Sequence, residues 1–182
     1  MIRWTSGYVD LSVTVRGQNS TYIEPLEATT GHEDIKPYWL QGEMEGGAME
    51  TSCGVVLVNI DSILLLQYPQ GHWDLPKGHV ETTDVDYVAT VRRELAEETG
   101  ITDLIFDEDF VERTAYTYRH KGRKRDKEVF WFLAETETLD VALSHEHRDH
   151  LWLDWEQALA QLTHDETRSV VQKAWEKIKA SN

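Results

Sequence analysis

The spacing of apolar residues along the chain predicts the order of its main structural elements. Two apolar runs, separated by the polar turn Asn59–Ser62, predict buried strands at about 52–60 and 63–68. A helical pattern covers about 84–99, and Gly100 follows it in the position of a C-terminal cap. Further strands are predicted at about 110–119, 128–135 and 151–153, and further helices near 154–162 and 165–179.

Two segments between these elements have the composition of loops. Pro69 to His79 is punctuated by proline and glycine, and His120 to Lys127 is strongly basic, so we predict both as irregular connections. The strands and helices do not alternate strictly. This order predicts an α/β fold with a mixed β-sheet and helices on both of its faces.

The first 48 residues differ from the rest of the chain. They contain one alternating stretch, Tyr8–Val15, typical of a half-buried strand, and end in a segment rich in Gly and Glu. A buried-strand pattern begins directly after Met49. We therefore predict a working domain over 49–182 and an N-terminal extension over 1–48, which is an accessory hairpin, a mobile arm or an over-long start.

Composition limits the class of protein. A chain of 182 residues has room for one domain with a real core, and its apolar runs are too short to cross a bilayer. Cys53 is the sole cysteine, which excludes an internal disulfide and a cysteine-based zinc site. No secretory signal is visible, so we expect a cytoplasmic protein. The formal charge of −15 argues against general nucleic-acid binding, and a phosphate ligand would need bound metal or a local basic patch.

Three glutamates stand at an unfavourable place on the predicted helix. Glu94, Glu97 and Glu98 have the spacing that puts them on one face, in the last turns before Gly100. The helix dipole disfavours anions there by about 0.3–1 kcal/mol each. Divalent cations would reverse this cost, because Mg²⁺ prefers oxygen ligands. In a chain with 33 acidic residues, the alternative is an acidic, solvated helix face.

The surroundings of the three glutamates resemble a known motif. Gly78–Glu81 followed by Arg93–Ile101 resembles the Nudix box, and every specified position of its second half is matched. The first half departs from the motif, because the loop carries one extra residue and Asp84 stands in for the first glutamate. The resemblance implies a Nudix-type α/β/α sandwich.

Segments around the box narrow the resemblance. His72–Glu81, Lys127–Glu135 and Leu143–Leu153 are similar to asymmetrical diadenosine tetraphosphate hydrolases. The resemblance implies Mg²⁺-dependent hydrolysis, with Mn²⁺ as a substitute, of a small nucleoside polyphosphate. The favoured reaction converts diadenosine tetraphosphate into ATP and AMP.

The resemblance also implies roles for particular residues. Glu94, Glu97 and Glu98 are the expected metal ligands, with Glu98 shared between ions and Glu94 a candidate for orienting or deprotonating water. Glu146 is a candidate outer ligand or base. Arg93 is expected to point away from the glutamates and to hold the glycine loop by a charged hydrogen bond.

Other residues are candidates for binding the substrate. Lys77 and Lys127 are the expected phosphate contacts. Trp131, Phe130 or Tyr118 could stack on adenine, although strand aromatics more often belong to the core. Strand alternation puts Phe130 and Trp131 on opposite faces, and we favour Trp131. His145, His147 and His150 with Asp149 form a weaker alternative, a separate transition-metal site.

Two alternatives to this reaction stay open. One is another Nudix activity, on an RNA 5′ end, ADP-ribose, or a longer dinucleoside or inositol polyphosphate. The other is a Nudix-like module that senses nucleotides without cutting them. The three crowded glutamates argue against the second alternative, and the extra loop residue argues for it. The sequence leaves the oligomeric state open.

Overall fold

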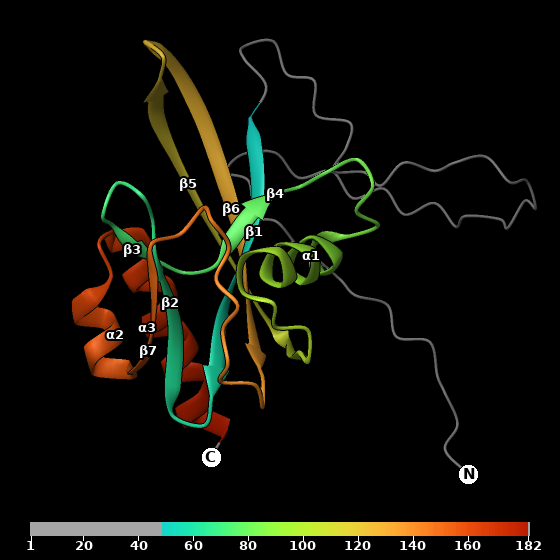
Figure 1. Ribbon diagram of the computed structural model, residues 1–182, viewed down its shortest axis with the longest axis vertical. Helices are drawn as coiled ribbons and strands as arrows, with labels where there is room; N and C mark the ends of the chain where they lie inside the picture. The colour runs from blue at the N-terminus through green and yellow to red at the C-terminus, as the bar shows by residue number, and fades with distance from the viewer. Residues whose placement is uncertain (1–48, 182) are drawn as a thin grey trace, which may run out of the picture. The chain divides into compact units, whose positions relative to one another are not determined.

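The computed structural model describes residues 49–181 (Figure 1). The strand expected at Tyr8–Val15 and the N-terminal extension lie outside these residues. In the described part, β1 (Glu50–Asn59) is central in a sheet of seven strands. It pairs in parallel with β6 (Arg123–Glu135) and antiparallel with β2 (Ser62–Gln67) and the short β4 (Lys77–His79).

The remaining strands extend the sheet on both sides of β1. The long β5 (Ile105–His120) pairs antiparallel with β6 and forms one edge. On the other side, β7 (Asp149–Asp154) and the two-residue β3 (Trp73–Asp74) both pair antiparallel with β2. One parallel pair among antiparallel ones makes a mixed sheet, as the sequence predicted.

Helices cover both faces of the sheet (Figure 1). Alternate residues of β1 point to opposite sides, and each set belongs to a separate core. Val56 and Val58 pack with residues of α2 (Trp155–Gln161) and α3 (Asp165–Ser181). Val55 and Leu57 pack with residues of α1 (Tyr87–Thr99). The predicted α/β class with a layer of helices on each face is confirmed.

Two predicted loops are wrong, for one shared reason. Residues 120–127 mostly belong to strands, because β5 and β6 continue to a turn of only two residues, Lys121 and Gly122. Both turn residues have positive φ, 48° and 79°, as tight hairpin turns of type I′ require. Residues 69–79 likewise contain β3 and β4. In each segment backbone pairing across the sheet overrides a loop-like composition.

The ends of the helices differ from the prediction by a few residues. The first helix begins at Tyr87 rather than near residue 84, because Asp86 caps it by accepting a hydrogen bond from the Ala89 amide at 2.7 Å. At its other end Gly100 adopts φ 75°, as predicted for a C-terminal cap. None of the helices in residues 49–181 combines the length and apolar character that spanning a membrane demands.

Candidate active site

The glutamates of the predicted metal site lie on α1, which the sheet fixes in place. Val91 and Leu95 anchor the helix in the core on this side of β1. The flank beside these two residues carries Glu94 and Glu98 towards β4, and Glu97 lies further round the helix with its side chain 62% exposed. All three lie in its last turns, where the helix dipole disfavours negative charge.

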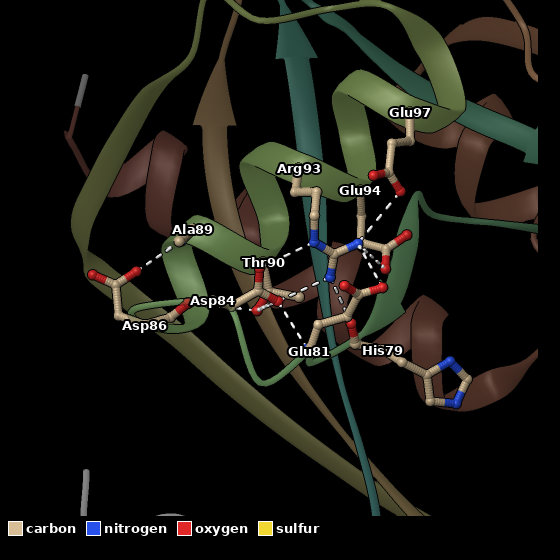
Figure 2. A network of polar contacts seen from close by, with 9 residues as sticks. All are labelled: His79, Glu81, Asp84, Asp86, Ala89, Thr90, Arg93, Glu94 and Glu97. Carbon is tan, nitrogen blue, oxygen red and sulfur yellow. Dashed lines mark hydrogen bonds and ion pairs between the residues drawn. The ribbon is translucent and has the colours of Figure 1, made fainter. Parts of the chain in front are cut away.

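Glu94 packs directly on the backbone of β4. A Cβ atom added to Gly78 would lie 1.8 Å from the carboxyl carbon of Glu94, so only glycine leaves room for this carboxylate. Burial raises the pKa of Glu94, and the neighbouring Arg93 guanidinium opposes the rise. Figure 2 shows the Glu94 carboxylate beside that guanidinium, with Nη1 donating to Oε1 at 2.9 Å.

Glu98 is the most enclosed of the three carboxylates, with 5% of the residue exposed. Its Oε2 accepts a hydrogen bond from the Lys77 backbone N–H at 3.2 Å, and its Oε1 lies 3.4 Å from Nε2 of His147. Burial raises the pKa of Glu98 to about 8; the Lys77 ammonium opposes the rise, and the Glu94 and Glu146 carboxylates add to it. A buried carboxylate with two acidic neighbours attracts a cation.

Arg93 links the glycine loop to the glutamates. Its Nη2 donates to the carbonyl of His79 at 2.8 Å, which is the loop contact expected from the sequence. The expectation that Arg93 points away from the glutamates is wrong, because Nη1 contacts Glu94 at 2.9 Å and Glu97 at 3.3 Å. The arginine side chain is long and its guanidinium carries five N–H donors, so it can contact the loop and the glutamates at the same time.

Asp84 closes this network from the loop (Figure 2). Its two oxygens accept from Nε and Nη2 of Arg93 at 3.0 and 2.9 Å, and one of them also accepts from Thr90 Oγ1 at 2.8 Å. Hydrogen bonding to Arg93 holds the pKa of Asp84 well below its usual range. The residue that replaces the first glutamate of the box is therefore paired with the box arginine.

The donors at this end of α1 suit a hard divalent cation by type and by charge. In residues 49–181, however, no three Asp, Glu, His or Cys side chains already converge on one point as ligands. Arg93 draws the carboxylates of Glu94 and Glu97 towards itself, and the Glu97 side chain is 62% exposed. The same finding leaves the alternative site at His145, His147, His150 and Asp149 without support.

A cavity of about 350 Å³ opens on the side of the sheet that faces α3, and Lys77 of β4 is among the residues that line it. Lys77 connects this cavity with Glu98, because Lys77 lines the cavity while its backbone N–H donates to the Glu98 carboxylate. Its Nζ donates to Asp74 at 2.8 Å and to the Tyr68 hydroxyl at 2.9 Å. Against the effect of burial, Tyr68 and Asp74 raise the pKa of Lys77, which keeps it charged.

Aromatic residues form much of the cavity wall, and both Trp131 and Tyr118 line it. Trp131 is only 3% exposed, packs over Gly54 and donates from Nε1 to Thr114 at 2.9 Å. Tyr118 donates from its hydroxyl to Glu50 at 2.5 Å. Phe130 lies on the opposite face, stacked on Tyr87 at 4.6 Å, as strand alternation predicted.

The other two predicted residues lie at the border of the site. Lys127 is half-buried beside Tyr116 of β5, and burial, followed by the repulsion from Lys77, lowers its pKa. Glu146 is exposed on the loop before β7, close enough to Glu98 to act on its charge.

Several residues of the site were missed or misassigned in the sequence. Tyr116 lines the cavity together with Tyr118, and the alternation of residues along β5 could have revealed it. His164 and Tyr68 come from segments whose contact with the site depends on the tertiary fold. His147 was considered only as a metal ligand, whereas its side chain is 1% exposed and faces Glu98. Burial lowers the pKa of His147, and so does the Lys77 ammonium.

The fold and the site together agree with one protein family. The family model described as NUDIX domain matches residues 49–174. The chain belongs to the NUDIX family, and it is a hydrolase of that family.

Named relatives refine this assignment. The asymmetrical bis(5′-nucleosyl)-tetraphosphatase of Rattus norvegicus is 38% identical over 116 residues, which cover 60% of this chain and 76% of the rat protein. The Caenorhabditis elegans enzyme of the same name is 36% identical over 114 residues, which cover 60% of this chain and 80% of that protein. The resemblance to this subgroup is confirmed.

A solved structure agrees with the sequence relatives. The crystal structure of a C. elegans Ap4A hydrolase binary complex superimposes with a TM-score of 0.64 at 32% identity. The match covers 72% of this chain and 99% of the C. elegans chain. The fold therefore has a solved counterpart.

Proposed function

We propose that this protein hydrolyses diadenosine tetraphosphate asymmetrically, to ATP and AMP, with Mg²⁺ as its cofactor. One observation carries the proposal: Lys77 joins the aromatic cavity to the buried carboxylate of Glu98. A nucleoside bound in the cavity would place its phosphate chain against the acidic end of α1. The names of the relatives support this choice of substrate.

The residues divide the work between binding and chemistry. Glu94, Glu97 and Glu98 would hold Mg²⁺, which would neutralise charge on the phosphates and supply Lewis acidity. Tyr118 and Trp131, which both line the cavity, would receive the base. Lys77 has three N–H donors, of which two go to Asp74 and Tyr68, so the third is available for a phosphate oxygen.

Charged residues at the border of the site complete the mechanism. Lys127 adds positive charge where the chain of phosphates leaves the cavity. Glu146 accepts a proton from the attacking water or orients it. Arg93 holds the loop to the helix, and its contacts with Glu94 and Glu97 would have to open for these carboxylates to hold a metal ion. Residues 49–182 form the working domain in this proposal, in keeping with a family match that begins at residue 49.

Replacing Glu98 tests the proposal. Glu98→Gln keeps the shape of the side chain and removes its charge, so we expect the fold to persist and kcat to fall by about 100-fold or more. Glu156→Gln, on the exposed first turn of α2, is the matched control and should leave kcat unchanged. The measurement is product formation from diadenosine tetraphosphate at saturating Mg²⁺. Full activity of the Glu98 variant would sink the assignment of the glutamates.

A panel of substrates separates the alternatives. Diadenosine tetra-, penta- and hexaphosphate, ADP-ribose and a 5′-triphosphorylated RNA are compared by kcat/KM and by their products. The proposal requires the tetraphosphate to have the highest kcat/KM and to yield ATP and AMP. Tight nucleotide binding without turnover of any substrate would instead identify a sensing module.

A further inference from the structure

The loop before β7 presses a histidine against the most enclosed carboxylate of the site. The His147 side chain is 1% exposed, and its Nε2 lies 3.4 Å from Oε1 of Glu98. Within residues 49–181, this Nε2 and the Ser52 hydroxyl are the buried side-chain atoms that lack a hydrogen-bond partner. A buried, unpartnered nitrogen aimed at a carboxylate costs free energy, so it calls for a reason.

The surroundings of His147 fix the position of its ring. The Ser144 amide donates to the Glu98 carbonyl at 2.9 Å, so the loop is tied to the last turn of α1. On the far side, the Arg148 amide donates to the Gln67 carbonyl at 2.8 Å. The ring packs edge-on against Tyr68, with 4.6 Å between the centroids.

The other ring nitrogen sets the direction of the proton. His147 Nδ1 lies 3.3 Å from the Ser144 hydroxyl. A hydroxyl that donates to Nδ1 leaves the proton of the neutral ring on Nε2, which then points at Glu98 as a donor. The backbone N–H of Lys77 already donates to the other oxygen of the same carboxylate.

We propose that His147 is a positioning residue that orients the Glu98 carboxylate through Nε2–H, opposite the Lys77 amide. Two donors on separate elements then fix both oxygens of a metal ligand, and partners of this kind typically change metal affinity by about 10–100-fold. The 3.4 Å separation shortens when the site is loaded, as hydrogen bonds at active sites commonly do. The inference rests on the proposed function, because it takes Glu98 as a ligand.

Two replacements of equal chemistry but different reach test the proposal. His147→Gln places an amide N–H2 where Nε2 was, whereas His147→Asn reaches only as far as Nδ1. We expect His147→Asn to weaken Mn²⁺ binding by about 10–100-fold and to lower kcat more than it changes KM. His147→Gln should restore most of both losses. Mn²⁺ binding is measured by electron paramagnetic resonance on the full chain without nucleotide, and thermal unfolding reports on the fold.

The outcomes separate this inference from the proposed function. Equal losses in the Gln and Asn variants, or unchanged Mn²⁺ affinity in both, overturn the role of His147. Failure of the wild-type chain to cleave diadenosine tetraphosphate overturns the proposed substrate, while the Mn²⁺ measurement still decides the role of His147. Should both variants unfold, Ser144→Ala keeps the ring and removes its Nδ1 partner. It must weaken Mn²⁺ binding, and an unchanged affinity contradicts the proposal.

Discussion

At the scale of single residues, Gly78 sets how closely the glutamates approach the sheet. It is required for space rather than for an unusual backbone angle, because any Cβ would lie within 2.2 Å of all three atoms of the Glu94 carboxyl group. Gly71 differs in both respects: it has φ 94° and no heavy atom within 4 Å of an added Cβ. The two glycines therefore separate the cost of crowding from the cost of backbone strain.

Gly78→Ala should damage the site more than the fold. The added methyl group displaces Glu94, and a shift of about 1 Å at a catalytic group costs about 100-fold in rate. Gly71→Ala is the control, because its strained φ should lower stability by about 1 kcal/mol while kcat stays near the wild-type value. The measurements are kcat at saturating Mg²⁺ and urea unfolding. Wild-type kcat in the Gly78 variant would contradict the proposed place of Glu94.

The sequence predicted where the three glutamates lie along α1, but it did not predict all the contacts around them. Local spacing places Glu94, Glu97 and Glu98 in the last turns of one helix, so predicting their location needed no tertiary information. The direction of the Arg93 side chain was missed, because it depends on how Asp84 and the loop fold back onto the helix. His147 meets Glu98 across about fifty residues of chain, and no local pattern encodes such a contact.

At the scale of elements, the loop before α1 depends on one partly buried ion pair. Asp84 has 6% of its side chain exposed and binds Arg93 through both oxygens. Its pKa is depressed in the folded protein, so it stabilises the fold at a pH above the unfolded value of about 3.9. This contribution is lost as the pH falls from there through the folded pKa.

Asp84→Asn should remove this stabilisation. At pH 7 we expect the free energy of unfolding to fall by about 1–3 kcal/mol, because Arg93 loses a charged partner. At about pH 3, below the unfolded pKa, the difference from the wild type should shrink. Asp86→Asn is the matched control, since asparagine caps a helix about as well as aspartate. The free energies of unfolding are measured with urea at both values of pH. A difference between variant and wild type that grows in acid would contradict the stabilising role of ionised Asp84.

The hairpin of β5 and β6 shows why the sequence predicted the order of elements better than their lengths. Its positively charged end lacks the apolar alternation by which a half-buried strand is recognised. Pairing nevertheless continues from Val111↔Phe132 to His120↔Arg123, because the two-residue turn holds the register. Backbone hydrogen bonding keeps these residues extended although few of their side chains are buried.

At the scale of the whole molecule, the chain has a net charge of −15 but gathers positive charge in one place. The tip of the β5–β6 hairpin gathers exposed cations from both strands and the turn: Arg119, Lys121, Arg123, Lys124 and Arg125. The hairpin extends beyond the rest of the sheet (Figure 1). An anionic substrate repelled by the acidic surface would be attracted at this end.

Neutralising the tip should slow association without affecting the chemistry. For Arg123→Gln with Lys124→Gln, we expect a lower kcat/KM at low salt, an unchanged kcat, and a difference that disappears once salt reduces the screening length below about 10 Å. Lys177→Gln with Lys179→Gln makes the same change in net charge on α3, where Lys177 lies 3.8 Å from Asp107, near the end of β5 that is far from the tip. Equal effects of the two pairs would show that only net charge matters.

Cys53 lies in β1, next to the glycine on which Trp131 packs, and none of its surface is exposed. Burial raises the pKa of this thiol to about 12, with the Asp84 carboxylate adding to the rise, so the thiolate that oxidants and alkylating agents attack is almost absent at neutral pH. The only thiol in the sequence is thus unreactive while the sheet remains folded. Redox conditions around the folded protein have no accessible thiol on which to act, and oxidation of Cys53 begins only after the strands have come apart.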